Sequence, residues 1–381
     1  MMIRSPNTAH GRGVRASQPI TGVTFGTPYR YNQGYPAKYA AGDVWYNTWS
    51  DDNEIYTAAG DFYTGFSGVG PYSYYTAFSR LDGFSNSLTG YQTNTLREMG
   101  LFGETGSDGA GWTWKPSGLA SVAGTLYMAL SRQKYADAGS DYIQVAHDAQ
   151  IIKSTDHGAT WTPLPPGNAQ PYASPMFPGY GFGAPGFIQY GKDYTGNGPH
   201  RSYEFIYATS SDGVWNNGST MVLGRCLLSN LSSLNGANWQ YWTGGDGLSD
   251  GNWSSTIGSA SPIISNARKI GMAGAQYLPY CQRYVMFQWY YPSRTTIPPT
   301  LSNYDTWWDV YEAPTPWGPW TLIHSEQFNV EGWYSPALVH KSLTTDGGQH
   351  ARLITSGNYD TYLDLENSVY QLTLMDVTFT N

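Results

Sequence analysis

The segment Ser154-Thr155-Asp156-His157-Gly158-Ala159-Thr160-Trp161 says most about how this chain folds. It has the composition of a hairpin turn: the side chains of Ser154 and Asp156 can hydrogen-bond the turn backbone, and Gly158 can adopt a positive φ. The Trp161 ring can then wedge between neighbouring strands. The segment therefore predicts a structural turn in a β-rich chain, and Asp156 is interpreted as a turn former rather than a catalytic acid.

Outward from this turn, the chain is a succession of short strand-like runs. They are rich in Val, Ile, Tyr, Trp and Thr and are bounded by Gly, Asn, Asp and Pro: 43–49, 54–61, 125–132, 203–210, 221–228, 283–290 and 369–379. No segment combines sustained helical periodicity with capping signals. The pattern predicts an all-β protein.

The runs recur with a long period. Candidate inner strands begin at intervals of about 67–79 residues, near Asp43, Lys115, Phe182, Ser261 and Tyr334. Each interval holds three or four strand-like runs, as the blades of a β-propeller require. We expect a five-bladed β-propeller, with residues 23–31 adding a strand to the last blade. A seven-bladed propeller is the alternative, but it needs strands in loops rich in Gly and Pro.

Composition narrows the classes of partner. The 381 residues include 20 Lys+Arg and 28 Asp+Glu, so the net charge is −8 and only 13% of residues are charged. Coiled coils and helical repeats are excluded, and an acidic chain without basic runs is a poor ligand for nucleic acid. The 32 Tyr and 15 Trp favour a neutral, hydroxyl-rich ligand such as a polysaccharide or oligosaccharide.

The same survey sets expectations for organisation and location. We expect a disordered or extended segment over residues 1–20, followed by a single catalytic propeller domain over residues 21–381. The sequence contains no run of 18 apolar residues, the pattern that would predict a membrane span, and no signal peptide is visible. We expect a secreted or periplasmic monomer that binds neither membrane nor nucleic acid.

The richest candidate site lies in the first predicted blade. Two strand-like runs flank a turn centred on Asp52, a register that places Asp43 opposite Asp61. Facing carboxylates lie close enough for repulsion to raise one pKa, which gives the acid and base of a glycoside hydrolase. A register shifted by one residue would instead place them on opposite faces, and a metal site is a third interpretation.

Other residues are candidates at the rim or on the inner strands. Glu331 is a candidate third catalytic carboxylate. The candidate substrate-binding residues are Trp45 and Tyr334 as stacking platforms, Arg225 as a clamp, and Lys115 and Glu204 as further polar contacts.

Two other functions stay open. A polysaccharide lyase would need a base such as Tyr334 or His147 and a uronate neutraliser such as Arg225 or Lys115. A non-catalytic sugar-binding propeller would need only the aromatic surfaces.

Cofactor signals are weak. The seven His show no zinc-ligand spacing, so no cofactor is expected. A Gly-rich loop with Asp246, Asp250 and Asn252 is a candidate structural calcium site, although an ordinary polar loop explains it more simply. Cys226 and Cys281 are expected to be buried free thiols rather than a disulfide.

Several blocks together resemble a family of bacterial β-propellers of unassigned function related to the endo-D-arabinanase glycoside hydrolases. They are residues 43–52, 55–61, 154–161, 182–187, 221–225 and 311–321, the last containing Pro-Trp-Gly-Pro-Trp. The block 154–161 also resembles the Asp-box of sialidases. The resemblance spans about residues 40–360 and implies a five-bladed fold with paired catalytic aspartates on the first blade, at the positions of Asp43 and Asp61.

Overall fold

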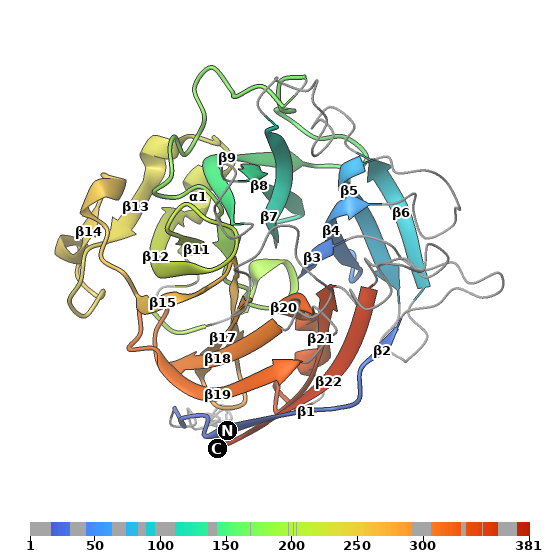
Figure 1. The fold of residues 1–381 in the computed structure, drawn as a ribbon, viewed down its shortest axis with the longest axis vertical. Helices are drawn as coiled ribbons and strands as arrows, with labels where there is room; N and C mark the ends of the chain where they lie inside the picture. The colour runs from blue at the N-terminus through green and yellow to red at the C-terminus, as the bar shows by residue number, and fades with distance from the viewer. Residues whose placement is uncertain are drawn as a thin grey trace, which may run out of the picture.

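The computed structural model of this protein describes residues 17–30, 43–62, 74–82, 89–95, 111–135, 143–167, 169–196, 198–200, 202, 204–291, 306–328, 333–344, 346–356 and 372–381. At positions 29–30, 61–62, 74–77, 82, 89–95 and 344 it describes the backbone alone. The described residues form five antiparallel sheets arranged around a central axis, as Figure 1 shows. The fold is therefore a five-bladed β-propeller, and the seven-bladed alternative is wrong.

The first two blades are simple antiparallel meanders. Blade 1 consists of β3 (Asp43–Trp49), β4 (Ile55–Phe62), β5 (Tyr74–Asp82) and β6 (Thr89–Thr95). Blade 2 consists of β7 (Thr113–Val122), β8 (Thr125–Tyr135) and β9 (Gln144–Ser154). Isolated bridges from Ala149 to Phe177 and from Lys153 to Thr162 extend its outer edge.

Blades 3 and 4 follow in the same order from the axis outward. Blade 3 consists of β10 (Gly186–Phe187), β11 (Phe205–Ser211), β12 (Gly218–Leu227), β13 (Trp239–Trp242) and β14 (Trp253–Ser254), with β15 (Ile264–Ile270) also paired to β12. Blade 4 consists of β16 (Ala275–Leu278), β17 (Arg283–Tyr290), β18 (Thr306–Ala313) and β19 (Thr321–Phe328).

The last blade contains both ends of the described chain. Blade 5 consists of β20 (Tyr334–Leu338), β21 (His350–Ser356) and β22 (Leu372–Thr380), to which β1 (Gly22–Phe25) and β2 (Tyr29–Arg30) are added. Figure 1 shows β1 running alongside β22. The prediction that residues 23–31 join the last blade is confirmed, and the pairing covers an edge of β22 that would otherwise be open.

Helix is scarce, as the sequence predicts. The helices in the described ranges are α1 (Leu228–Leu231) and short 3-10 turns at Lys192–Tyr194, Gly236–Asn238, Asp250–Asn252, Ile257–Ser259 and His340–Thr344. None of them has the length and apolar character that a bilayer-spanning helix needs.

The predicted inner strands agree with the structure in most blades. Inner strands begin at Asp43 and Tyr334, as predicted, and two residues before Lys115. The strand predicted near Ser261 is wrong: the segment that follows forms β15, which pairs with β12 in blade 3, and the inner strand of blade 4 begins at Ala275. The run 264–270 has strand composition, but its pairing partner depends on tertiary contacts that composition does not encode.

The turn at Ser154–Trp161 adopts the predicted hydrogen bonds. The Ser154 hydroxyl accepts from Gly158 N (2.7 Å) and donates to Asp156 Oδ1 (2.7 Å). The Asp156 carboxylate accepts from the backbone N and side-chain hydroxyl of Thr160. Gly158 has φ 90° and Trp161 packs edge-on against Phe78 of blade 1, 5.0 Å between ring centroids. The turn therefore joins blades 1 and 2.

Two further predictions concern the core and the N-terminus. Cys226 and Cys281 are both buried and free, as predicted. Residues 17–20 are described and hydrogen-bond to blades 4 and 5, for example from Gln18 N to Cys281 O and from Ser17 Oγ to Gln282 O. The rest of the predicted 1–20 segment lies outside the described residues.

Candidate functional site

A carboxylate and a phenol meet where two inner strands begin. The face on which β3, β7 and β20 begin is called the start face here. At this face the Tyr334 hydroxyl of blade 5 donates a hydrogen bond of 2.6 Å to Asp43 Oδ2 of blade 1. The next residue, Val44, donates from its backbone N to Ser356 Oγ of β21 (2.6 Å). Blade 5 therefore fixes the position of the Asp43 carboxylate.

The backbone beside this pair is strained. Val44 and Trp45 have φ values of 62° and 21°, and Ser335, which follows Tyr334, has φ 49°. A positive φ is uncommon for any residue with a side chain and is unfavourable for a β-branched residue such as Val44. Strain of this kind persists only where surrounding contacts enforce it, and it concentrates at functional sites.

The strain accompanies a β-bulge that changes the predicted register. From Tyr46–Ala58 to Trp49–Ile55, the β3–β4 hairpin pairs symmetrically about Asp52, as predicted. The register then shifts between Tyr46 and Asp43, so Asp43 pairs with Gly60. The predicted cross-strand pairing of Asp43 with Asp61 is therefore wrong, because a bulge inserts an extra residue into one strand.

Gly60 gives the Asp43 carboxylate its room. A Cβ added to Gly60 would lie 2.4 Å from Asp43 Oδ1 and 3.4 Å from Val44 Cγ2. A side chain at this position would displace the Asp43 carboxylate. The side chain of Asp61 and the whole of Glu331 lie outside the described residues, so their catalytic roles stay predictions.

Aromatic side chains surround Tyr334. Its ring lies 5.3 Å from Trp215 and 5.3 Å from Trp289, measured between centroids, and 6.5 Å from Tyr291. Trp215 and Trp289 themselves contact edge-to-face at 4.7 Å. This packing holds the phenol in place and brings the β11–β12 connection, which carries Trp215, to the start face.

Burial changes the roles predicted for the two aromatic platforms. Trp45 and Tyr334 are each 0% exposed, so neither ring has a face open to a sugar. Tyr334 is at the candidate site, but as the donor to Asp43 rather than as a stacking surface.

Lys115 is buried on the inner strand of blade 2. Ser121 N of that strand donates to Thr48 Oγ1 of β3 (3.0 Å). Counting back from this contact along the two inner strands places Lys115 at about the level of Asp43.

Two predicted substrate-binding residues lie elsewhere. Arg225 is near the end of β12, where Phe205, the first residue of β11, pairs with Leu227, so it lies away from the start face. Its guanidinium stacks on Phe205 (4.2 Å) and Trp253 (4.1 Å) and donates to Asp250 Oδ1 (3.0 Å).

Glu204 immediately precedes β11 at that same end of blade 3. The structure therefore does not bring Arg225 or Glu204 to Asp43. Where a residue lies within its strand decides how far along the propeller axis its side chain is placed, and the sequence alone does not give that position.

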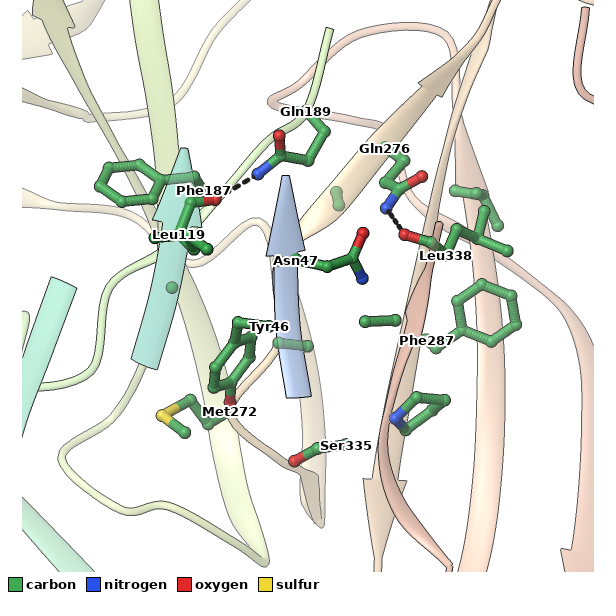
Figure 2. A pocket seen from close by; sticks show the side chains of 17 residues that line it. Tyr46, Asn47, Leu119, Phe187, Gln189, Met272, Gln276, Phe287, Ser335 and Leu338 are labelled. Carbon is green, nitrogen blue, oxygen red and sulfur yellow. Dashed lines mark hydrogen bonds between the residues drawn. The ribbon is translucent and has the colours of Figure 1, made fainter. Parts of the chain in front are cut away.

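A small cavity lies on the axis beneath the start face. It is lined by residues of all five blades, and Figure 2 shows the Asn47 amide between Gln189 and Gln276. Gln189 donates to Leu119 O (2.6 Å) and Gln276 to Leu338 O (2.5 Å), while neither amide atom of Asn47 has a hydrogen-bond partner among the described residues. Its volume of about 40 Å³ accommodates roughly three water molecules.

Tyr46 lies between this cavity and Asp43. Burial raises the pKa of its phenol well above the ordinary value, the neighbouring Ser335 side chain acts in the opposite direction, and the Asp43 charge raises it further. Tyr46 is therefore a neutral phenol and a poor acid or base at this site.

The predicted calcium loop is held by its own contacts. Asp246 Oδ1 accepts from Leu248 N (3.0 Å) and Asn252 Nδ2 (2.5 Å), and Asp250 accepts from Arg225. Within the described ranges, ligand atoms close enough to share a metal ion occur at Asp51, Asp52 and His157, on the face opposite Asp43. There the His157 imidazole already pairs with Asp51 Oδ1 at 2.9 Å.

Sequence patterns did not single out Trp215 or Ser356. Both reach the site from connections or strand ends of distant blades, and only the propeller topology brings them together. The signal available was Gly213-Val214-Trp215-Asn216-Asn217, a turn-forming segment with one large aromatic residue.

The five sheets place the protein in the class of five-bladed β-propellers. Among solved structures of this fold, it is similar to a protein from Bacteroides ovatus designated a hydrolase (TM-score 0.54, 13% identity, covering 92% of this chain and 87% of the other). It is also similar to the α-L-arabinofuranosidase of Podospora anserina in complex with cellotriose (TM-score 0.50, 10% identity, covering 94% of this chain and 97% of the other). No family model and no curated protein matches the sequence.

Proposed function

We propose that this protein is a glycoside hydrolase acting on a neutral polysaccharide or oligosaccharide, with Asp43 as one of its two working carboxylates. The observation that carries the proposal is the Asp43–Tyr334 hydrogen bond at the start face. The backbone beside this pair is strained, and aromatic rings pack around Tyr334. A hydrogen bond donated to a carboxylate stabilises the ionised form, which is the form that a base or nucleophile needs. This is the role that we propose for Asp43.

Hydrolysis also needs an acid to protonate the leaving oxygen. Asp61, one residue beyond the Gly60 that packs under Asp43, and Glu331, three residues before Tyr334, are the candidates. The Podospora protein of the same fold is an α-L-arabinofuranosidase and was solved in complex with cellotriose. This complex supports neutral sugars as the first substrates to test.

The decisive experiment measures reducing ends released from a panel of neutral polysaccharides by the wild type and by Asp43→Asn. General acid–base groups contribute about 100- to 10,000-fold, so we expect a loss of that size with an unchanged melting temperature. Asp61→Asn and Glu331→Gln, assayed in parallel, identify the second carboxylate. Full activity of Asp43→Asn would remove Asp43 from the mechanism.

Tyr334→Phe tests the phenol separately. It keeps the ring among Trp215, Trp289 and Tyr291 and removes the hydrogen bond to Asp43. We expect kcat to fall by roughly 10-fold or more with KM nearly unchanged, since the hydroxyl positions a catalytic group rather than the sugar. A change in KM alone would contradict this role.

The lyase alternative has less support. Of its two predicted uronate neutralisers, Arg225 is sandwiched between rings away from the start face, whereas Lys115 lies at about the level of Asp43 but is buried. One predicted base, Tyr334, donates to Asp43. The other predicted base, His147, pairs through Nδ1 with Asp148 Oδ1 at 2.9 Å. Absorbance of an unsaturated product during digestion would establish a lyase, and binding without any cleavage would establish a sugar-binding propeller.

A further inference from the structure

A second concave surface lies on blade 3, on the start face. This surface, the Tyr180 groove, is bounded by Tyr180, Asp212, Val222, Ile257 and Gly258. Its volume is about 260 Å³, below the roughly 300–1,000 Å³ of pockets that enclose whole drug-sized ligands. The groove therefore suits a single ring of a longer ligand.

The walls of the groove combine an aromatic ring with a carboxylate. Tyr180 is 50% exposed, unusually open for a large aromatic side chain, and its ring meets His147 edge-to-face at 4.5 Å. Asp212 is exposed and, within the described ranges, accepts from Ser219 N alone (3.0 Å), which leaves acceptor capacity for ligand hydroxyls. Among the described residues that line the groove there is no lysine or arginine.

One chain segment connects the groove to the candidate active site. Asp212 and Trp215 belong to the same β11–β12 connection, and three residues span at most about 11 Å. Trp215 packs on Tyr334, which holds Asp43. A ligand with one ring near Asp43 can therefore extend along this connection to Tyr180.

Several hydrogen bonds fix the connection before any ligand arrives. Gly213 O accepts from Ala146 N (2.8 Å), and Trp215 N donates to Gln144 O (2.8 Å). The Asn217 amide donates to Tyr291 O (2.7 Å) and accepts from Tyr291 N (3.0 Å). Preorganisation of this kind lowers the entropic cost of binding.

We propose that the Tyr180 groove is a distal subsite that binds a neutral sugar ring of an extended oligosaccharide whose scissile bond lies near Asp43. The tyrosine ring stacks on the apolar face of the sugar, and Asp212 accepts its hydroxyls. The same carboxylate disfavours uronates, because the described residues that line the groove include no lysine or arginine. The proposal rests on the proposed function for the position of the scissile bond, but not for the binding itself.

The test compares Tyr180→Ala and Gly258→Leu with matched controls. A Cβ at Gly258 meets nothing within 4 Å, so a leucine there fills the groove without disturbing the fold. Gly167→Leu, equally open but outside the groove, controls for the added side chain. Tyr135→Ala, 43% exposed on β8, controls for loss of an exposed tyrosine.

Binding is measured by calorimetry in an Asp43→Asn background, with ladders of arabino-, xylo-, cello- and galacturono-oligosaccharides of increasing length. We expect both groove variants to bind the longer neutral oligosaccharides about tenfold more weakly than the parent. Their affinity for the shortest oligosaccharide that binds should be unchanged. The two controls should match the parent. Wild-type kinetics should show KM falling with chain length, and Tyr180→Ala should abolish that dependence.

The outcomes separate this proposal from the hydrolase assignment. If the wild type cleaves its substrate and both groove variants keep the parental dependence on length, the groove proposal fails and the hydrolase stands. If the wild type cleaves nothing but both variants lose affinity for longer neutral chains, the groove stands and the hydrolase fails. Binding of the galacturonate ladder alone would overturn the neutral-sugar assignment.

Discussion

At the scale of the residue, the candidate site depends on one glycine as much as on its acid. Asp43 could be selected from the sequence because it follows a glycine and begins a strand-like run. The contact between its carboxylate and Gly60 could not be predicted, because it results from a bulge that shifts pairing by one residue. Tyr334 was predicted as a site residue but with a different role, since burial of its ring depends on three other blades.

Gly60→Ala should therefore impair catalysis while leaving the propeller folded. The new methyl group would occupy the position of Asp43 Oδ1 and displace the carboxylate from Tyr334. Small misplacements of reacting groups cost about 100-fold, so we expect kcat to fall by that order. Gly167→Ala, whose Cβ meets nothing within 4 Å, is the control. Normal turnover by Gly60→Ala would show that the carboxylate position does not limit the reaction.

At the scale of the element, strands and turns were more predictable than their partners. The long period of the strand-like runs predicted the starting residues of the inner strands of blades 1 and 5, and local turn chemistry predicted the Ser154–Trp161 turn. Assignment of β15 failed because nothing local distinguishes a strand that pairs with β12 from an inner strand of blade 4. Pairing is decided by contacts between segments distant in sequence.

One contact between turns makes stability depend on pH. His157 in the Ser154–Trp161 turn pairs with Asp51 in the β3–β4 turn, with Asp52 at 3.8 Å. The Asp51 hydrogen bond, opposed by burial and aided by the charges of Asp52, Asp51 and Asp156, raises the pKa of His157 above its usual 6.5. The His157 hydrogen bond is the main cause that lowers the pKa of Asp51 below its usual 3.8.

The raised pKa of His157 means that its stabilisation is complete below pH 6.5 and is lost as the pH rises through the raised value. The lowered pKa of Asp51 means that the contribution of Asp51 to folding stability is present above pH 3.8. That contribution is lost as the pH falls through the lowered pKa. Both side chains are about 40% exposed, so solvent screening limits the pair to roughly 0–1 kcal/mol.

Asp51→Asn should accordingly lower the melting temperature by at most about 2 °C near pH 5 and by nothing measurable near pH 9. Melting curves across this range for wild type, Asp51→Asn, His157→Gln and the double variant check the prediction. The double variant should melt like either single variant once the pair is lost. A pH-independent difference would show that the pair contributes through packing alone.

At the scale of the whole molecule, the chain is closed into a ring by its two ends. Ile20 and Val23 are 2% and 7% exposed in the core next to β22. A chain that begins at residue 31 would expose the β22 edge and lose the burial of these side chains, roughly 3–6 kcal/mol. We expect denaturant unfolding at a lower midpoint and association through the open edge, measured by light scattering. An unchanged midpoint would contradict the role of β1 and β2 in closing the ring.

The pairing of β1 with β22 also has a consequence for synthesis. Thr21 N and Thr380 O, whose hydrogen bond of 2.7 Å extends this pairing, belong to residues 359 positions apart in sequence. At about 5–20 residues per second, the ribosome needs roughly 20–70 s to make the intervening chain. The edge of β1 that pairs with β22 therefore has no partner until β22 has been synthesised. Blade 5 cannot close before that point, so the growing chain exposes one unpaired strand throughout this time.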